Sequence, residues 1–300
     1  MNSQSIPSLE ALSQVQRERL AYIDFRLYFL GEVRRQDLIS RFGVAPAAAT
    51  RDFTQYKELF PGNISFDNST KAYVIGGDFT PAFDHAPERV LTSLSQGFGD
   101  GISQVSGPLL TCELPFNFNR PSLAVLAPVT RAISTKKAVR LSYCSHTSGM
   151  AKREVVPFAL VNDGLRWHVR AFDRKSQEFR DFVFTRMEKV SVIEDGAIQK
   201  HELSSEDIQW NRIVELDLVP HPSQKYPEII ERDYGMTGGE LKVRVRAAIA
   251  GYVLRQWIVD CSTEHSLQGN EYRLWLRDNL TLYGVSSALL APGYQRIDKQ

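Results

Sequence analysis

The hydrophobic period of the chain changes near residue 137, and this change constrains the fold more than any other feature. In the first 80 residues, apolar side chains such as Leu20, Ile23 and Leu27 recur at helical spacing. From residue 137 onward, apolar and polar residues alternate over short stretches, as they do in strands. The pattern predicts an α+β chain of several domains, because 300 residues exceed the usual length of one domain.

The first 80 residues predict three helices followed by a β-hairpin, which is the order of a winged helix-turn-helix. Gly43 is a stop signal for the second helix, and Pro46 suits the first turn of the third. A turn-rich tetrapeptide separates the two short strands of the hairpin. We expect these elements at residues 15–30, 34–42, 46–59, 64–66 and 72–75.

The third helix has a face suited to reading DNA. Ala49, Phe53 and Tyr56 share one side and are expected to pack inward. The opposite side carries Arg and Gln, which recognise guanine and adenine in the major groove, and hydroxyl groups that can reach phosphate. The candidate DNA-binding residues are Thr50, Arg51, Thr54 and Gln55 on this helix, Arg34 and Arg35 at the start of the second helix, and Ser69, Thr70 and Lys71 at the hairpin tip.

Charge is distributed unevenly along the chain. The 36 Lys and Arg residues and 35 Asp and Glu residues give a net charge of +1, which argues against a generic nucleic-acid coat. Residues 1–80 are neutral overall, which counts against DNA binding and leaves a small protein-binding helical domain as an alternative. Residues 131–190 hold 13 basic and 6 acidic residues, whereas residues 191–300 have a net charge of −4. The basic block favours an anionic ligand.

Arg and aromatic side chains are expected to converge in this basic block. Strand alternation puts His168 and Arg170 on one face of a strand, and Arg180, Phe182 and Arg186 on one face of the next. Arg binds phosphate bidentately and aromatic rings stack on bases, so a shared face would suit a nucleotide. A solvated face paired with acidic residues is the alternative, although the basic excess makes full pairing within the block impossible.

The same block resembles a WYL domain, through the runs REVVPFALV at 153–161, RWHVRAFD at 166–173 and FRDF at 179–182. The domain is named after a Trp-Tyr-Leu tripeptide, where this chain has Trp-His-Val at 167–169. The order of winged helix-turn-helix, WYL domain and C-terminal extension is similar to that of WYL transcriptional regulators. The Trp-His variant resembles the repressors encoded beside bacterial phage-defence systems such as BREX and CBASS.

The resemblance implies an Sm-like or SH3-like WYL barrel that senses a nucleotide or nucleic acid, and a C-terminal domain that helps to dimerise the chain. The ligand residues carried over are Tyr143, Ser145, His168, Arg170, Arg180, Phe182 and Arg186. We expect a winged helix-turn-helix at 1–80, a helical connector at 81–136, the barrel at 137–200, a linker at 201–224 and a small α+β dimerisation domain at 225–300.

Other classes of function have no motif in the sequence. Cys112, Cys144 and Cys261 show no metal-ligand spacing, and a reduced cytoplasm is the simplest compartment. No apolar run approaches the length of a membrane span. Catalytic signatures and nucleotide-binding loops are missing from the sequence, so no catalytic residue, metal or cofactor is expected.

These inferences predict a homodimeric repressor that binds an inverted repeat in double-stranded DNA and controls a phage-defence operon. Capture of an anionic effector, a nucleotide or oligonucleotide, would change the spacing of its two recognition helices. A single-stranded nucleic-acid or nucleotide sensor without sequence-specific DNA binding is the main alternative. A nucleotide-processing enzyme is a third and weaker one.

Overall fold

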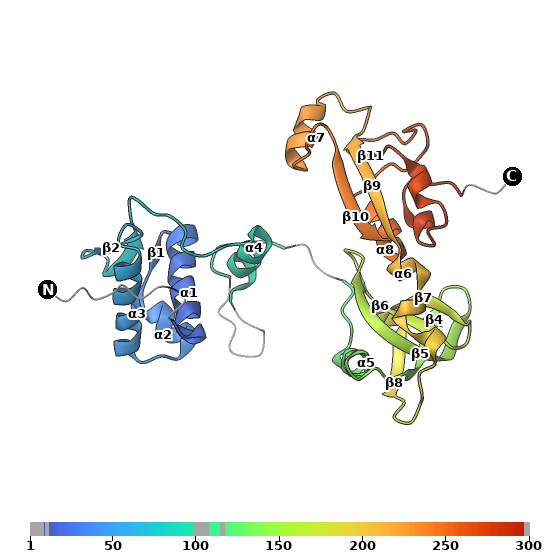
Figure 1. Cartoon of the computed structure of the whole chain (residues 1–300), viewed down its shortest axis with the longest axis horizontal. Coiled ribbons are helices and arrows are strands. Elements are labelled where there is room, and N and C mark those ends of the chain that lie inside the picture. The colour runs from blue at the N-terminus through green and yellow to red at the C-terminus, as the bar shows by residue number, and fades with distance from the viewer. Residues whose placement is uncertain (1–8, 10–11, 99–107, 115–117, 297–300) are drawn as a thin grey trace. The chain divides into compact units, whose positions relative to one another are not determined.

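The chain divides near residue 115 into two compact units (Figure 1). The computed structural model describes residues 9, 12–98, 108–114 and 118–296. The glycine-rich stretch that follows Gly97 lies largely outside these described residues.

The N-terminal unit is a winged helix domain, as the helical spacing predicts. The hairpin strands β2 and β3 follow the helices and form a three-stranded sheet of order β1-β3-β2 with β1, which lies between α1 and α2. Strand β1 was not predicted because it is only two residues long. Gly43 ends α2 with a left-handed backbone, φ +62°, which a residue with a side chain rarely adopts. The elements are α1 Gln14–Leu30, β1 Glu32–Val33, α2 Arg35–Phe42, α3 Pro46–Leu59, β2 Ile64–Asp67, β3 Ala72–Ile75 and α4 Pro87–Gln96.

The core of this unit confirms the predicted inward face of α3. Ala49, Phe53 and Tyr56 are each at most 1% exposed, and they pack with buried side chains of α1 such as Leu20. The Phe53 ring stacks on Tyr73 of β3, with centroids 4.0 Å apart and planes at 5°. The hairpin is therefore fixed to the inner side of α3, which leaves the other side of that helix exposed.

A buried polar network fastens the segment after the hairpin to the same core. The Tyr56 hydroxyl donates to Asp24 Oδ1 at 2.5 Å, and the Ala82 amide donates to the same oxygen at 3.1 Å. His85 Nε2 lies 2.9 Å from Asp24 Oδ2. Burial, followed by the hydrogen bond to Asp24, raises the pKa of Tyr56, so this phenol stays protonated as a donor. Residues up to His85 thus pack as part of the winged helix unit.

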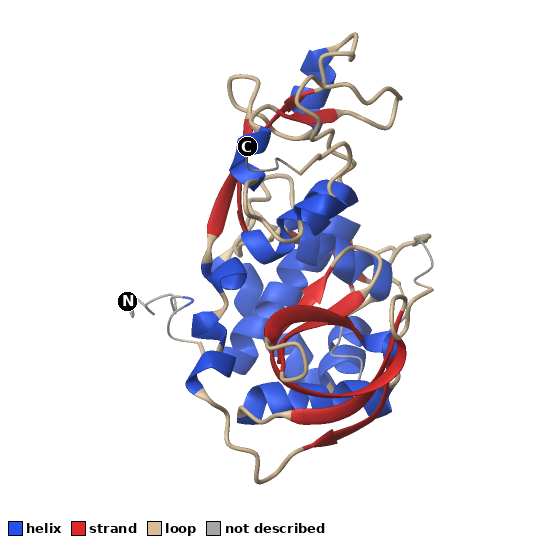
Figure 2. Ribbon diagram, turned by 90° about the vertical axis from the view of Figure 1, so that its right-hand side faces the viewer, coloured by secondary structure: helices blue, strands red, loops and turns tan. Residues whose placement is uncertain are grey.

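The second unit begins with a helix on a five-stranded antiparallel sheet of order β7-β6-β5-β4-β8. The sheet curves strongly (Figure 2), and its longest strand, β5, has an irregular register between Pro157 and Ala159. The helix, expected in a connector, instead buries Val125, Val129 and Ala132 in the core of this sheet. The elements are α5 Leu123–Thr135, β4 Val139–Ser145, β5 Gly149–Asn162, β6 Trp167–Asp173, β7 Glu178–Val183 and β8 Met187–Val192.

The C-terminal part of this unit is a second small sheet, of order β10-β9-β11, packed with helices. Its central strand lies inside the stretch 201–224, so the expectation of a linker there was wrong. Val214, Leu216 and Leu218 alternate into the core, each at most 3% exposed, and this alternation was readable from the sequence. The elements are α6 Ile208–Asn211, β9 Ile213–Pro220, α7 Pro227–Asp233, β10 Leu241–Arg246, α8 Ala247–Gln256 and β11 Leu274–Leu276.

Replacing Tyr56→Phe tests the buried network of the winged helix unit. The substitution removes a donor to buried Asp24, and we expect a loss of about 1–3 kcal/mol in the stability of this unit. Amide hydrogen exchange in α1 and α3 measures that loss. Tyr73→Phe is the matched control, because the Tyr73 hydroxyl has no hydrogen bond among the described residues. Equal exchange rates in the two variants would contradict the role given to Asp24.

Candidate nucleic-acid interface and ligand site

The exposed side of α3 carries two side chains whose polar ends are free. Arg51 is exposed and Gln55 half-exposed, and neither makes a hydrogen bond or ion pair within the described part of the chain. Thr50 and Thr54 donate their hydroxyl protons to backbone carbonyls one turn earlier, at 3.0 and 3.1 Å. Among the four candidates on α3, Arg51 and Gln55 are thus the ones with unused donors.

An ion pair that the sequence analysis missed sets the position of α3. Arg19 of α1 donates to both carboxylate oxygens of Asp52, from Nε at 2.6 Å and from Nη2 at 3.0 Å. Asp52 is 2% exposed, and its hydrogen bond raises the pKa of Arg19. This bidentate contact fixes the rotation of α3 about its axis. Since Arg51 directly precedes Asp52, the same contact sets the direction in which Arg51 points.

The hairpin tip is organised by a carboxylate. The Ser69 amide and hydroxyl donate to Asp67 Oδ1 at 2.8 and 2.6 Å, and Thr70 donates to Oδ2 at 2.8 Å. These hydrogen bonds lower the pKa of Asp67 to about 2. The two hydroxyl protons are therefore engaged within the turn, whereas Lys71 is exposed and unpaired among the described residues.

The two remaining candidates lie at the start of α2. Arg34 is paired with Glu32, with Nε 3.3 Å from the carboxylate, and both side chains are exposed. Arg35 is exposed and has no ion pair in the part of the chain that the structure describes. The candidate cations left free for phosphate or bases are therefore Arg35, Arg51 and Lys71.

The candidate ligand residues do not share one face, and that expectation was wrong. In the antiparallel register, Arg170 lies opposite Asp181, and Val169 lies opposite Phe182. Because directly opposed residues point to the same side of a sheet, Phe182 faces the core with Val169. An offset of one residue between the two strands reverses which side chains meet, and sequence alternation does not reveal that offset.

The other predicted ligand residues fall into separate places. Tyr143 is 9% exposed and packs edge-on against Phe182, with ring centroids 5.0 Å apart. Arg186 donates to His146 Nε2 at 2.8 Å. Ser145 shares a hydrogen bond with Thr147, and Arg180 donates to Glu178 at 2.7 Å. Ligand binding by these residues stays a prediction.

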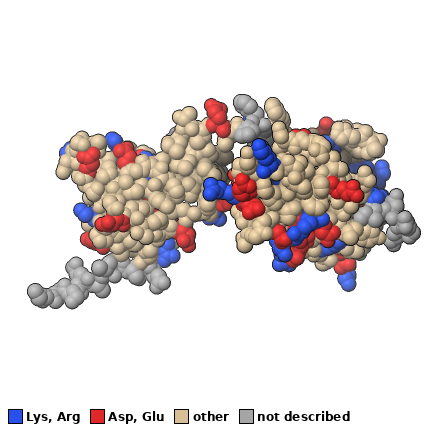
Figure 3. Space-filling model, turned by 90° about the horizontal axis from the view of Figure 1, so that it is seen from above, with Lys and Arg blue, Asp and Glu red and all other residues tan. Residues whose placement is uncertain are grey.

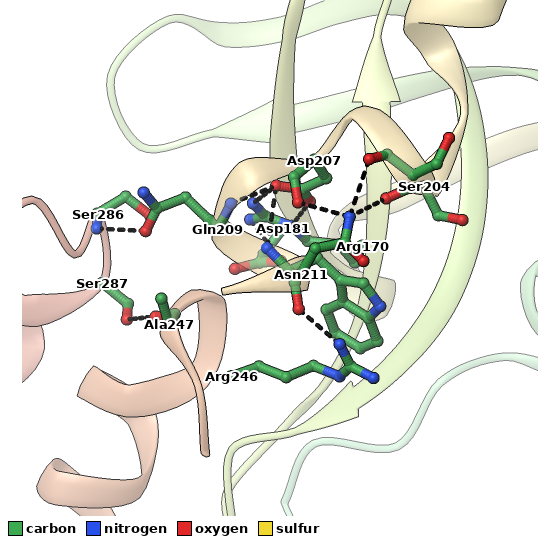
Figure 4. A network of polar contacts seen from close by, with 12 residues as sticks. Arg170, Asp181, Ser204, Asp207, Gln209, Asn211, Arg246, Ala247, Ser286 and Ser287 are labelled. Atoms are coloured by element: carbon green, nitrogen blue, oxygen red, sulfur yellow. Dashed lines mark hydrogen bonds and ion pairs between the residues drawn. The ribbon is translucent and has the colours of Figure 1, made fainter. Parts of the chain in front are cut away.

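Arg170 is instead the centre of a buried charged cluster (Figure 4). The side chain is 4% exposed. It donates to both oxygens of Asp207, from Nε at 2.8 Å and from Nη2 at 3.2 Å, and to Asp181 Oδ1 from Nη1 at 3.2 Å. Burial disfavours the charged guanidinium, yet the two carboxylates outweigh it and raise the pKa of Arg170.

A third carboxylate, Asp163 in the turn before β6, continues the cluster toward α8. It accepts from His168 Nε2 at 3.0 Å and from Arg255 Nη2 at 2.8 Å, and two backbone amides of the turn also donate to it. Burial raises the pKa of Asp163, but these hydrogen bonds outweigh burial and hold it at about 2. Tyr252 of α8 donates to Asp181 at 3.0 Å. Two of the predicted ligand residues, His168 and Arg170, thus take part in contacts that join the first sheet to the C-terminal part.

The basic excess of residues 131–190 is partly neutralised from outside that block. Arg170 pairs with Asp207, and Arg174 binds both oxygens of Glu202 at 2.6 and 2.9 Å. Both carboxylates come from the acidic stretch 191–300. The uneven distribution of charge in the sequence therefore already indicated pairing between the two stretches. On the face drawn in Figure 3, basic and acidic side chains lie beside one another.

Family models match three stretches of the chain. They describe the BrxR transcriptional regulator winged helix-turn-helix domain over residues 15–96, the WYL domain over 124–192, and the BrxR transcriptional regulator C-terminal dimerization domain over 213–282. The last match begins at β9.

Sequence relatives agree with these matches. The DNA-binding transcriptional repressor CapW of Escherichia coli (strain KTE188) is 31% identical over 256 residues, which cover 80% of this chain and 82% of that protein. The chain belongs to the CapW family of WYL-domain transcriptional repressors. CapW of Pseudomonas aeruginosa is 32% identical over 252 residues, with 80% and 82% covered. CapW of Stenotrophomonas maltophilia is 29% identical over 281 residues, with 88% and 93% covered.

Membership of the CapW family confirms the resemblance to WYL regulators of this type, and these relatives are named as repressors rather than enzymes. Among the described residues, no group of three or more His, Cys, Asp or Glu side chains is placed to hold a metal ion. No helix in the described ranges is long and apolar enough to cross a membrane.

Asp163 makes the stability of the second unit depend on pH. The folded pKa of about 2 lies below the value of about 3.9 for an unfolded Asp, so the stabilisation is complete above about pH 4. We expect it to be lost as the pH falls toward 2. Urea unfolding followed by tryptophan fluorescence measures this, because all four tryptophans lie after residue 160.

Asp163→Asn is expected to lower the free energy of unfolding by at least about 1–3 kcal/mol at neutral pH, and to flatten its decline below pH 4. The control is Asp195→Asn, an exposed carboxylate without a partner among the described residues. An unchanged acid profile in Asp163→Asn would contradict the contacts assigned to this residue.

Proposed function

We propose that this protein is a homodimeric repressor that binds an inverted repeat in double-stranded DNA through α3, and that it controls a phage-defence operon. The observation that carries the DNA-binding part is the exposed face of α3, where Arg51 and Gln55 keep unused donors. The match to a winged helix-turn-helix model and the names of the relatives support it.

Recognition follows from the chemistry of these two side chains. The Arg51 guanidinium forms bidentate hydrogen bonds with guanine, and the Gln55 amide forms them with adenine. Arg35 and Lys71 supply phosphate contacts at either side of the helix. In a two-fold dimer, the two α3 helices enter major grooves about 34–36 Å apart on one side of the duplex. The match to a C-terminal dimerization domain supports the dimer.

Effector sensing is assigned to the WYL domain. The domain concentrates basic residues, and Arg170 lies at its junction with the C-terminal part. An anion that binds there and makes different contacts in two arrangements of the junction would shift the equilibrium between them. Nucleotides and oligonucleotides are the anions that suit Arg.

Arg51→Ala is expected to weaken binding to the DNA upstream of the gene by about 1–3 kcal/mol, roughly 5- to 150-fold. The loss of a base contact is the physical reason. Electrophoretic mobility shift at fixed salt measures the affinity. Lys175→Ala, which removes the same charge at an exposed and unpaired position of the WYL domain, is the matched control. Equal affinities for Arg51→Ala and Lys175→Ala would place recognition elsewhere.

Control of the operon is tested by transcription. Deleting the gene is expected to raise transcription of the adjacent operon, and the wild-type gene supplied in trans is expected to restore the low level. Supplying Arg51→Ala instead should leave transcription high. Transcription that is unchanged by the deletion would contradict repression.

A further inference from the structure

The proposed effector site already contains an anion, which belongs to the protein itself. We propose that Asp207 is a built-in competitor for the effector on Arg170, and that an anion which displaces Asp207 loosens the C-terminal dimerization part. The inference rests on the effector sensing proposed above. It specifies which contact the effector must replace and how the change reaches the rest of the chain.

Because the Arg and Asp charges of the cluster already balance, an anionic effector has to replace one of its carboxylates rather than join them. The three Arg and three Asp side chains of the cluster balance one another before any ligand binds; these are Arg166, Arg170, Arg255, Asp163, Asp181 and Asp207. Asp163 and Asp207 are at most 2% exposed, and an additional anion among them would be a buried charge without compensation. Replacing one carboxylate by the ligand keeps Arg170 neutralised throughout, which avoids the cost of a buried unpaired cation.

Asp207 is the carboxylate that can leave. Asp181 belongs to β7 and is held in the register of the sheet. Asp163 pairs with Arg166 and Arg255, and no contact joins it to Arg170 among the described residues. Asp207 lies outside both sheets, between a short 3-10 turn and the single turn of α6. Its departure therefore breaks no strand pairing.

A polar atom without a partner lies on the same face of β6. His168 Nδ1 is buried and makes no hydrogen bond within the described part of the chain, while Nε2 is bound to Asp163. Residues two apart on a strand point to the same side, so this nitrogen is on the side of the Arg170 guanidinium. Unpaired buried polar atoms are rare because they are costly. A ligand with a hydroxyl group, such as a ribose, would pair it.

Asp207 also holds α6, which connects it to the C-terminal part. Its Oδ1 accepts from the backbone amides of Gln209 and Trp210 at 3.1 and 3.2 Å, as an N-cap does. The Gln209 side chain binds the backbone of Ser286 at 2.9 Å, and Arg246 donates to the Trp210 carbonyl at 2.6 Å (Figure 4). When Asp207 leaves, α6 loses its cap, and these contacts lose their anchor.

Asp207→Asn separates the two roles of this residue. Asparagine caps a helix about as well as aspartate, but it has no charge with which to compete for Arg170. With inorganic pyrophosphate as the probe in isothermal titration calorimetry on the full chain, we expect Asp207→Asn to bind at least roughly tenfold more tightly than wild type. Arg170→Gln in the same background should abolish the gain.

The matched control is Glu202→Gln, which removes a buried carboxylate of the same stretch that pairs with Arg174 rather than Arg170. It should bind pyrophosphate like the wild type. In hydrogen exchange, saturating pyrophosphate should increase exchange at the amides of Gln209 and Trp210 in wild type. A protein Asp207→Asn that binds pyrophosphate no more tightly than wild type, or not at all, overturns the proposal, as does an equal gain in Glu202→Gln.

A mobility shift with the upstream DNA distinguishes this proposal from the proposed function. If wild type shifts the DNA but Asp207→Asn gains no affinity for pyrophosphate, the repressor function is supported and the proposed competition by Asp207 is refuted. If wild type fails to shift the DNA, the repressor function itself falls, whatever the result with pyrophosphate.

Discussion

A buried guanidinium has to be neutralised where it lies, and Arg170 imposes this requirement on the second unit. Taking the charge out of water costs several kcal/mol unless carboxylates and good geometry compensate. Asp181 comes from the neighbouring strand, but Asp207 comes from the segment that leads into the C-terminal part. The WYL sheet and the C-terminal part are therefore joined by charge as well as by packing. Removing either carboxylate leaves Arg170 with a single acidic partner and the cluster with one uncompensated positive charge, which lowers the stability of the junction.

The winged helix unit leaves basic side chains free for DNA, although residues 1–80 have no excess of Lys and Arg over Asp and Glu. In residues 1–80 the Asp and Glu residues equal the Lys and Arg residues in number, and several of these carboxylates are used inside the fold. Asp52 holds Arg19, and Asp24 accepts from Tyr56. The carboxylates are thereby taken up in positioning α3, while Arg51 on the same helix remains free. A net charge near zero is compatible with DNA binding when the acidic residues serve the core.

Periodic features were predictable from the sequence, and pairings across the chain were not. The inward face of α3 and the three helices before the hairpin follow from spacing alone. The strand β9 was missed although Val214, Leu216 and Leu218 alternate, because turn residues nearby suggested a linker. The prediction that the ligand residues share one face was wrong for a different reason. The register of β6 against β7 depends on the turn between them, which a strand pattern does not reveal. Partners such as Arg19 and Asp52 are 33 residues apart, beyond any local pattern.

The central claim is that the pairing of Arg170 with Asp207 holds the WYL sheet to the C-terminal part. A double-mutant cycle of Arg170→Gln and Asp207→Asn, read as the free energy of urea unfolding by tryptophan fluorescence, tests it most directly. We predict a coupling energy above about 1 kcal/mol, within the range of about 0.5–3 kcal/mol known for residues in contact. Single-variant effects that add to the double-variant effect within about 0.3 kcal/mol would contradict it.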